Sequence, residues 1–516
     1  MHRLSRFVLL AAAALALGGC AILRDSYDTP EVELPETFQE ADKLASESED
    51  AEAAGETPQE PDRLPRDLSK WWTGFENPEL NRLVETALTS NFDVQSAIAR
   101  LAQAEAGFRQ TRANEFPELQ GIAESRVEAP EDGVGTVGDG ESVSTEQTHR
   151  LGLRASYEVD LWGANRAASI AAFERSQASA FARRTVAWTL TADVVNAYLE
   201  YLSLQDRIAT ARKTLSVFQE LLDAVVARME GGEADGLQVA QQRTAVAEAA
   251  AAIPELKRQR DEARHRLAVL LGTTPSQLNL EGTSLSEIAY PTVAPGVPAR
   301  LLLRRPDLKA AEHRLLAADA DIDTARAAFL PQFNLTAEGG IGSDLLQALI
   351  RPESLFFDAF GSVVQDIFDA GANEANLRAA RARHRELIAT YRQTSLTALR
   401  EVEDALSAVH FAQRRLEAQR DAVNASGESL DLNRQAYDLG VIDYISLLDA
   451  QRTLFDNDDQ VFQIALQRAQ ASVALFKALG GDTEAQATAG GTVPDTARPA
   501  EAPETGTSGD ATEAAP

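Results

Sequence analysis

The sequence has little of several residue types on which other protein classes depend. Its single cysteine, Cys20, excludes an internal disulfide, and its two methionines give no hint of a path for soft metals. None of the six histidines lies within metal-ligand spacing of another. The sequence also lacks a phosphate-binding loop and a nucleophile elbow. We therefore expect no catalytic residue, no cofactor and no metal site.

Basic residues are also scarce, with 49 Lys and Arg against 79 Asp and Glu and a formal net charge of -30. Nucleic-acid binding depends on clustered Lys and Arg that contact the phosphates, so a nucleic-acid partner is not expected. Much of the acidic excess lies in residues 25–62, and a Thr/Ala/Glu/Pro tail follows at 482–516. Both segments offer too little apolar surface to offset chain entropy. We interpret them as an acidic tether, within residues 20–66, and a disordered tail.

The N-terminus has the pattern of a secreted protein. Arg3 and Arg6 flank the start of an apolar run that is too short to span a bilayer and ends in Leu-Gly-Gly before Cys20. This resembles a bacterial lipobox, which predicts a signal peptide over 1–19 and a lipidated Cys20. The alternative is an ordinary signal peptide with an incidental cysteine. By resemblance to lipoprotein sorting rules, Ala21 favours the outer membrane.

The body is a tandem repeat. An offset of 214 residues maps Arg100-Leu101 onto Arg314-Leu315, and an offset of 208 then maps Gly232 onto Gly440. We divide the chain into repeat 1 (67–272), a connecting segment (273–300) and repeat 2 (301–481). The six extra residues of repeat 1 fall near Pro130 to Thr145, a Gly/Ser/Asp/Glu-rich stretch that predicts an exposed hairpin loop.

Each repeat predicts a very long helix followed by a returning one. No glycine or proline occurs from Ala164 to Glu230, which predicts a helix about 100 Å long. Its apolar residues step by alternating fours and threes, as in a coiled coil. Turns at Gly232 and Gly440 precede returning helices, which start near Leu237 and Ile445. In the first of these we expect a kink or break at Pro254.

Four segments predict strands with one apolar face. Residues 150–163 alternate apolar and polar side chains, and similar segments start near Glu118, Phe333 and Leu355. Their lengths match the roughly 9 to 11 residues of a tilted membrane strand. A half-buried sheet of a soluble domain is the alternative. Because about eight strands are needed to close a membrane barrel, four strands must be pooled between chains.

In order along the chain, these landmarks resemble the TolC-like outer-membrane factors, most closely the lipoprotein branch of OprM- and NodT-type efflux channels. The resemblance covers about residues 64–481. Its residues are Trp71-Trp72 with Phe75 and Pro78, residues 157–163, Arg305 to Leu308 with 310–312, Phe368 to Gly371, Glu401-Val402, Leu448 to Arg452, and Lys477 to Gly481.

The resemblance implies a mainly α fold with a small β part. Long coiled-coil helices and two β-hairpins would assemble as a trimeric α-barrel with a shared 12-stranded transmembrane β-barrel. The homotrimer would be lipid-anchored in the outer membrane of a Gram-negative bacterium and extend into the periplasm. Its implied partners are a periplasmic membrane-fusion adaptor, an inner-membrane pump, most readily of the RND type, and outer-membrane lipid.

The resemblance also implies functional residues at the periplasmic tip. An adaptor would contact the two turns, and the second turn and its returning helix would close the duct with a periplasmic gate. Ile442 stands where some relatives place an arginine partner for the gate tyrosine. The implied adaptor contacts are Gly232, Asp235, Gly440, Asp443 and Tyr444, and the implied gate residues are Ile445, Asp449 and Tyr437.

Physically, a ring of Asp449 carboxylates would favour cations, and a ring of Ile445 side chains could bar water by dewetting. Alternatively, Asp449 solvates a helix face and Ile445 packs in the coiled-coil seam.

The function that explains all these features is a passive exit duct of a tripartite efflux system for small molecules. A type I protein-secretion duct shares the architecture and is the alternative within that class. A periplasmic coiled-coil scaffold lipoprotein explains the helices but gives the amphipathic strands no role.

Overall fold

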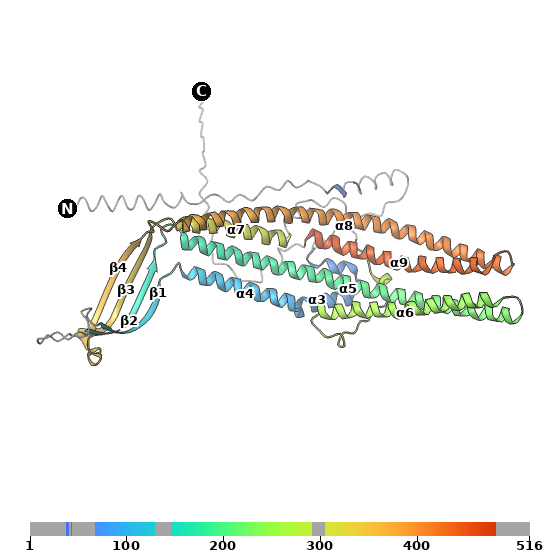
Figure 1. Ribbon diagram of the computed structural model, residues 1–516, viewed down its shortest axis with the longest axis horizontal. Coiled ribbons are helices and arrows are strands. Elements are labelled where there is room, and N and C mark those ends of the chain that lie inside the picture. Colours follow the sequence, from blue (N-terminus) through green and yellow to red (C-terminus); the bar gives the residue numbers. More distant parts are fainter. Residues whose placement is uncertain (1–37, 41–42, 44–67, 129–145, 292–304, 481–516) are drawn as a thin grey trace, which may run out of the picture.

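The computed structural model describes residues 38–40, 43, 68–128, 146–291 and 305–480. The expected signal peptide, Cys20, the loop after Pro130 and the tail at 482–516 lie outside the described residues. The described chain is elongated, with a small sheet at one end and two helical turns at the other (Figure 1). In the described part, no helix combines the length and hydropathy needed to cross a membrane.

The two halves contain the same elements in the same order. In each half, a 22-residue helix leads into a β-hairpin, a 67-residue helix and a returning helix. The first half has α4 (Phe92–Ala113), β1 (Glu118–Glu128), β2 (Glu146–Glu158), α5 (Ala164–Glu230) and α6 (Gly236–Leu270). The second has α7 (Pro306–Ala327), β3 (Gln332–Ser343), β4 (Leu355–Val364), α8 (Ala372–Asp438) and α9 (Tyr444–Leu479). The mainly α fold, its tandem repeat and its two hairpins are confirmed.

The four strands form one antiparallel sheet in the order β1-β2-β3-β4. Leu151 pairs with Ile341, and Ala337 pairs with Ala359. Many large apolar side chains of the sheet, such as Phe357, are exposed in the single chain. β1 and β4 each have one edge without a partner strand in this sheet. Two short 3-10 helices, η4 (Leu346–Ala348) and η5 (Pro352–Ser354), connect β3 to β4.

The strand expected over 150–163 is wrong at its end, because β2 stops at Glu158. The residues after it make the turn into α5 instead. Asp160 accepts a hydrogen bond from the Arg166 backbone N–H at 2.9 Å, and Gly163 has φ 78°. That left-handed conformation favours glycine. Alternation of side chains continues past the strand in the sequence. The backbone leaves the sheet after Val159, whose N–H still donates to the Phe333 carbonyl of β3 at 2.8 Å.

The helices lie side by side in one layer of four columns. In two of these columns, a 22-residue helix stacks end to end on a returning helix. Asn91, at the start of α4, donates a side-chain hydrogen bond to the Leu270 carbonyl at the end of α6, at 2.9 Å. Arg305, at the start of α7, does the same to the Ala478 carbonyl near the end of α9, at 2.8 Å. The columns are therefore α4 on α6, α5, α7 on α9, and α8 (Figure 1).

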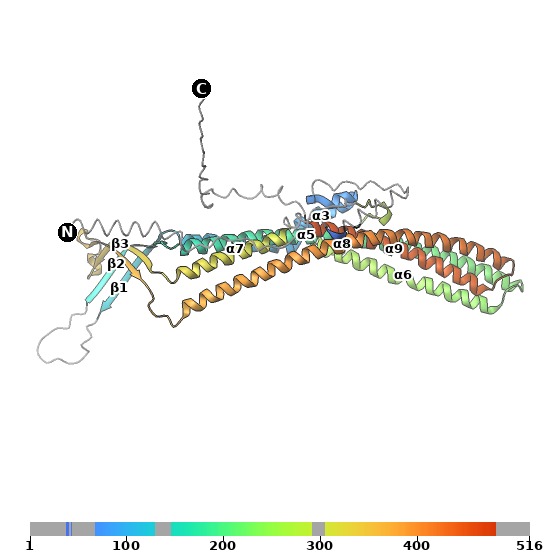
Figure 2. The same cartoon turned by 90° about the horizontal axis from the view of Figure 1, so that it is seen from above.

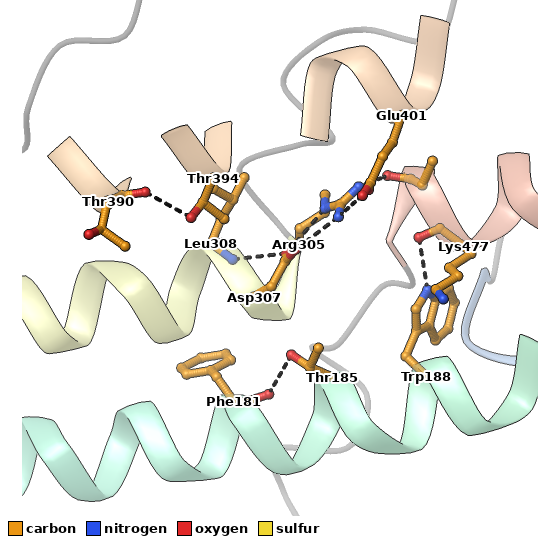
Figure 3. A network of polar contacts seen from close by, with 11 residues as sticks. Phe181, Thr185, Trp188, Arg305, Asp307, Leu308, Thr390, Thr394, Glu401 and Lys477 are labelled. Atoms are coloured by element: carbon orange, nitrogen blue, oxygen red, sulfur yellow. Dashed lines mark hydrogen bonds and ion pairs between the residues drawn. The ribbon is translucent and has the colours of Figure 1, made fainter. Parts of the chain in front are cut away.

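Arg305 also binds two carboxylates at the junction between α9 and α7 (Figure 3). Its Nη2 lies 2.8 Å from Asp307 and 2.7 Å from Glu401 of α8. Burial lowers the pKa of Arg305, but the hydrogen bonds with Asp307 and Glu401 outweigh it and leave the pKa raised. Three helices thus meet on one buried guanidinium.

Of the kink or break expected at Pro254, the break is wrong, because α6 continues through it to Leu270. Proline removes the backbone hydrogen bond to the residue four positions earlier. On both sides of it, Ile253 and Leu256 are buried in the cluster that packs α6 against α5. This packing holds the helix together despite the missing hydrogen bond.

A collar formed by η1 (Leu68–Phe75), α3 (Pro78–Ser90) and η2 (Leu285–Glu287) lies on one side of the helix layer (Figure 2). Trp71 is buried there and stacks on Phe476 of α9 at 5.5 Å between ring centroids. Its ring also meets the Trp188 ring of α5 edge-on. The largest apolar cluster of the described chain therefore joins the collar to α5 and α9.

Part of the predicted tether is packed, so the interpretation of 25–62 as wholly unstructured is wrong at Phe38. Its side chain is fully buried in a cluster with Leu308 and Val402, among others. The backbone N–H groups of Gln39 and Glu40 donate to the Glu403 carboxylate at 2.8 and 2.9 Å. The composition averaged over the segment does not reveal this contact, because a single aromatic side chain makes it.

Candidate functional site at the helical tip

The two helical turns lie beside each other at the end farthest from the sheet (Figure 1). Gly232 and Gly440 have φ 81° and 72°, a conformation in which glycine is unstrained. After each turn an aspartate caps the next helix. Asp235 accepts the Gln238 N–H at 3.0 Å, and Asp443 accepts the Ser446 N–H at 3.0 Å.

Both aspartates, expected only as adaptor contacts, thus also cap a helix. The signal is present in the sequence, since Asp is a favoured residue directly before a helix. Hydrogen bonds from Ser446 lower the pKa of Asp443, so its carboxylate stays charged well into acid. The cap is therefore stable above the ordinary carboxyl pKa and is lost as pH falls through the lowered value.

The expected gate residues on α9 lie on the outer surface of the chain. The Ile445 side chain is 54% exposed, and Asp449 is exposed one turn further on. Within this chain Ile445 does not pack in the seam between α8 and α9, contrary to the alternative reading. Residues four apart share one face of a helix, so the two side chains project on the same side.

Tyr444, by contrast, is only 2% exposed. Its side chain points into the helix packing and cannot contact an adaptor, so its assignment as an adaptor contact is wrong. Its hydroxyl donates to the Oε1 of Gln242 on α6 at 2.6 Å. Burial raises the pKa of Tyr444, which keeps the hydroxyl a donor over the physiological range.

Tyr437 is buried as well and binds across to the first repeat. Its hydroxyl donates to the Oε1 of Gln238 on α6 at 3.1 Å. The Arg228 guanidinium of α5 lies 4.8 Å from the centre of its ring. Burial raises the pKa of Tyr437, with Arg228 acting in the opposite direction. Its partner in this chain is therefore Gln238, and Ile442 takes no part in the hydrogen bond.

Gln242 is the functional candidate that sequence reasoning missed. It is fully buried, and its Nε2 donates to the Phe218 carbonyl of α5 at 2.7 Å. It also accepts the Tyr444 hydroxyl, so one amide joins α5, α6 and α9. The available signal is an amide between the apolar residues Val239 and Ala245 of a returning helix. Its partner on α9 is 202 residues away and leaves no local pattern.

Ion pairs add less at the tip. Arg228 lies 3.6 Å from Asp438, and Arg452 lies 2.8 Å from Glu248. All four side chains are about one-third exposed or more, and such pairs contribute about 0–1 kcal/mol each. The hydrogen bonds of Tyr437 and Tyr444, together with the apolar cluster around them, therefore dominate the contact between the two coiled coils.

The sequence model of the family described as "Outer membrane efflux protein" matches residues 83–273 and 297–481. The pyoverdine export outer membrane protein OpmQ of Pseudomonas putida is 35% identical over 418 residues, covering 81% of this chain and 88% of that protein. The toluene efflux pump outer membrane protein TtgI of Pseudomonas putida is 33% identical over 471 residues, covering 91% and 97%.

Solved structures share the fold over nearly their whole length. The outer-membrane channel OprN superposes with a TM-score of 0.79 at 28% identity, covering 89% of this chain and 98% of that one. The open state of the Neisseria gonorrhoeae MtrE outer membrane channel superposes with a TM-score of 0.76, also at 28% identity and with the same coverage.

Proposed function

Because the chain belongs to the outer membrane efflux protein family, we propose that three copies form one continuous exit duct from the periplasm to the cell exterior. The chain itself is an outer-membrane efflux channel protein. The observation that carries the proposal is the combination, in one chain, of a sheet with exposed apolar side chains and two helices of 67 residues each. The scaffold alternative gives those apolar strands no partner.

Ring closure follows from the order of the elements. β1 and β4 are the two ends of the sheet, and α4 and α8 are the two margins of the helix layer. A contact of β4 with β1 of the next copy, and of α8 with its α4, is a head-to-tail interface. Such interfaces form a ring when the rotation closes, and closure removes the open strand edges. Three copies would supply twelve strands.

The partners of this duct would be a periplasmic adaptor and an inner-membrane pump. Relatives are named as outer membrane proteins of a toluene efflux pump and of pyoverdine export, which supports small-molecule efflux over protein secretion. The adaptor would meet the tip at the exposed turns, Gly232 with Asp235 and Gly440 with Asp443. An RND-type pump is the partner that the resemblance to efflux channels favours.

Lipidation at Cys20 would hold the chain at the inner leaflet of the outer membrane. Glu403, beside Phe38, lies about 31 residues below the membrane-side end of α8, or about 46 Å along the helix. About 18 residues separate Phe38 from Cys20, and an extended chain of that length spans about 60 Å. A lipid on Cys20 can therefore reach the bilayer while Phe38 stays bound.

Phe38→Ala is expected to release this segment while leaving the trimer assembled. The substitution removes the buried ring that holds the N–H groups of Gln39 and Glu40 at Glu403. We expect cleavage of the 38–43 region by added protease to accelerate at least tenfold, measured by mass spectrometry of the fragments. Phe38→Leu, which keeps an apolar side chain, is the control. Equal cleavage rates for the alanine variant and the wild type would contradict the docking.

The tip would act as the gate. Three Ile445 side chains around the axis would form an apolar constriction, and three Asp449 carboxylates would form an acidic ring. Tyr437 would hold the two coiled coils of each chain together through Gln238. The exposure of Ile445 and Asp449 on one face of α9 supports this assignment, because gate residues must project away from the chain's own packing.

Single-channel conductance in planar bilayers tests both the duct and the gate. Wild type is expected to give small, cation-favouring currents, and Asp449→Ala and Ile445→Ala are each expected to raise the conductance severalfold. Asp93→Ala, which removes an exposed carboxylate at the start of α4, is the control. Absence of current from trimers of verified mass, in wild type and variants alike, would refute the duct.

A further inference from the structure

A cavity of 370 Å³ lies between α4, α5 and α7 in the half of the helix layer nearer the sheet. Four of its nine lining residues are arginines: Arg100 of α4, Arg175 and Arg183 of α5, and Arg314 of α7. Arg100 and Arg314 are equivalent positions of the two repeats, so the duplication itself places two of the charges. The neighbours between them are small, mainly alanine and serine, which leaves the space open.

The positive charge of this cavity is largely unbalanced. Arg175 forms an ion pair with Asp321, and the Nη2 of Arg100 donates to the Ser96 hydroxyl at 3.0 Å. Within the described ranges, no carboxylate lies within 4 Å of Arg183 or Arg314, and the buried Nε of Arg183 has no hydrogen-bond acceptor. A buried guanidinium N–H without an acceptor is costly, and an anion would supply one.

The cavity opens on the side of the helix layer opposite the collar. On α5, Phe181, Arg184 and Trp188 share one face, and Trp188 meets the collar through Trp71. At about 100° per residue, Ala182 and Val186 lie on the opposite face. In Figure 2 the collar helix α3 lies on one side of α5, whereas α7 and α8 bend away towards the other. In a closed ring that carries the collar on its outer surface, the cavity would face the duct.

We propose that this cavity is a binding site for an anionic group, of the phosphate, sulfonate or carboxylate class, on solutes that pass through the duct. The inference rests on the proposed function for the identity of the solute, but not for the binding itself. Guanidinium groups match such oxyanions with paired hydrogen bonds. Three copies would place twelve arginines around the lumen.

The charge of the surrounding helices supports this assignment. The membrane-side stretches 92–113, 164–190, 306–327 and 372–392 together hold 15 Lys and Arg against 10 Asp and Glu, in a chain whose net charge is -30. A positive section inside an acidic protein concentrates anions locally. With Asp449 at the tip, the duct would thus have an acidic entrance and a basic interior.

Calorimetric titration of the detergent-solubilised trimer with inorganic phosphate tests the site directly. We expect saturable binding, one phosphate per chain, and a loss of affinity of at least tenfold in the double variant Arg100→Gln/Arg314→Gln. Both residues are exposed, so the variant should still fold, which trimer mass and circular dichroism verify. Arg82→Gln/Arg243→Gln, which removes the same charge from exposed positions outside the cavity, is the control.

Unsaturable binding by wild type across the millimolar range, or equal affinity of the cavity variant and the control, would overturn the proposal. Displacement of phosphate by added phosphatidylglycerol would also overturn it, by showing that the site takes a lipid headgroup instead of a soluble anion. Calorimetry detects binding without any ion current. Anion binding in the cavity can therefore be confirmed even if the trimer does not conduct, so failure of the binding proposal and failure of the duct proposal are distinguishable.

Discussion

Arg305→Ala is expected to lower the stability of the chain by about 3 kcal/mol, the lower end of the range for removing one partner of a buried pair, because Asp307 and Glu401 stay 31% and 42% exposed to solvent. The guanidinium is buried, and its side chain is only 10% exposed. Without it, Asp307 and Glu401 face each other as like charges, and the Ala478 carbonyl at the end of α9 loses its cap. The α7 and α9 column would then separate where Figure 3 shows it joined.

Thermal dissociation of the purified trimer, followed by circular dichroism and by gel mobility, measures this loss. We expect Arg305→Ala to dissociate at a clearly lower temperature than wild type, and Arg305→Lys to fall in between, because a lysine keeps the charge but not the paired geometry. Arg400→Ala is the matched control, since that residue makes only an exposed pair with Asp404 and should shift stability by less than about 0.5 kcal/mol. Equal melting of the Arg305→Ala and Arg400→Ala variants would contradict the junction's role.

The elements that the sequence predicts well are those whose cause is local. An uninterrupted heptad pattern without glycine or proline defines α5 from Ala164 to Glu230, and side-chain alternation defines the strands. The wrong predictions occur where contacts with residues far away in the sequence determine the local structure. Pro254 stays helical because α5 packs against its neighbours, and Phe38 is ordered because α7 and α8 form its pocket.

The tip shows the same division. Gly232 and Gly440 mark the turns because only local backbone geometry is involved. Family resemblance places Tyr437 at the tip, but the partner of its hydroxyl, Gln238, is 199 residues away. The error at Tyr444 has the same origin, since position next to a turn indicates exposure, whereas the side chain points into the packing between repeats.

Gln242→Leu is expected to shift the tip towards its open state by about 1–3 kcal/mol, or about 5- to 150-fold in the ratio of open to closed channels. Leucine has a similar size but cannot accept the Tyr444 hydroxyl, which is then buried without a partner. Separation of the α8/α9 coiled coil from α6 would expose that hydroxyl to water. On the proposal that the Tyr444–Gln242 contact belongs to the closed state, the closed state bears the cost and the open state does not.

Open probability in planar bilayers measures the shift, and a double-mutant cycle with Tyr444→Phe isolates the contact. Once the hydroxyl is absent, Gln242→Leu should have a much smaller effect, so the two substitutions should be clearly non-additive. Gln419→Leu is the matched control, because Gln419 binds Asn457 within the α8/α9 coiled coil and does not join the two repeats. An increase in open probability with Gln419→Leu equal to that with Gln242→Leu would show that any loosening of the coils opens the tip, and would reject Gln242 as a specific lock.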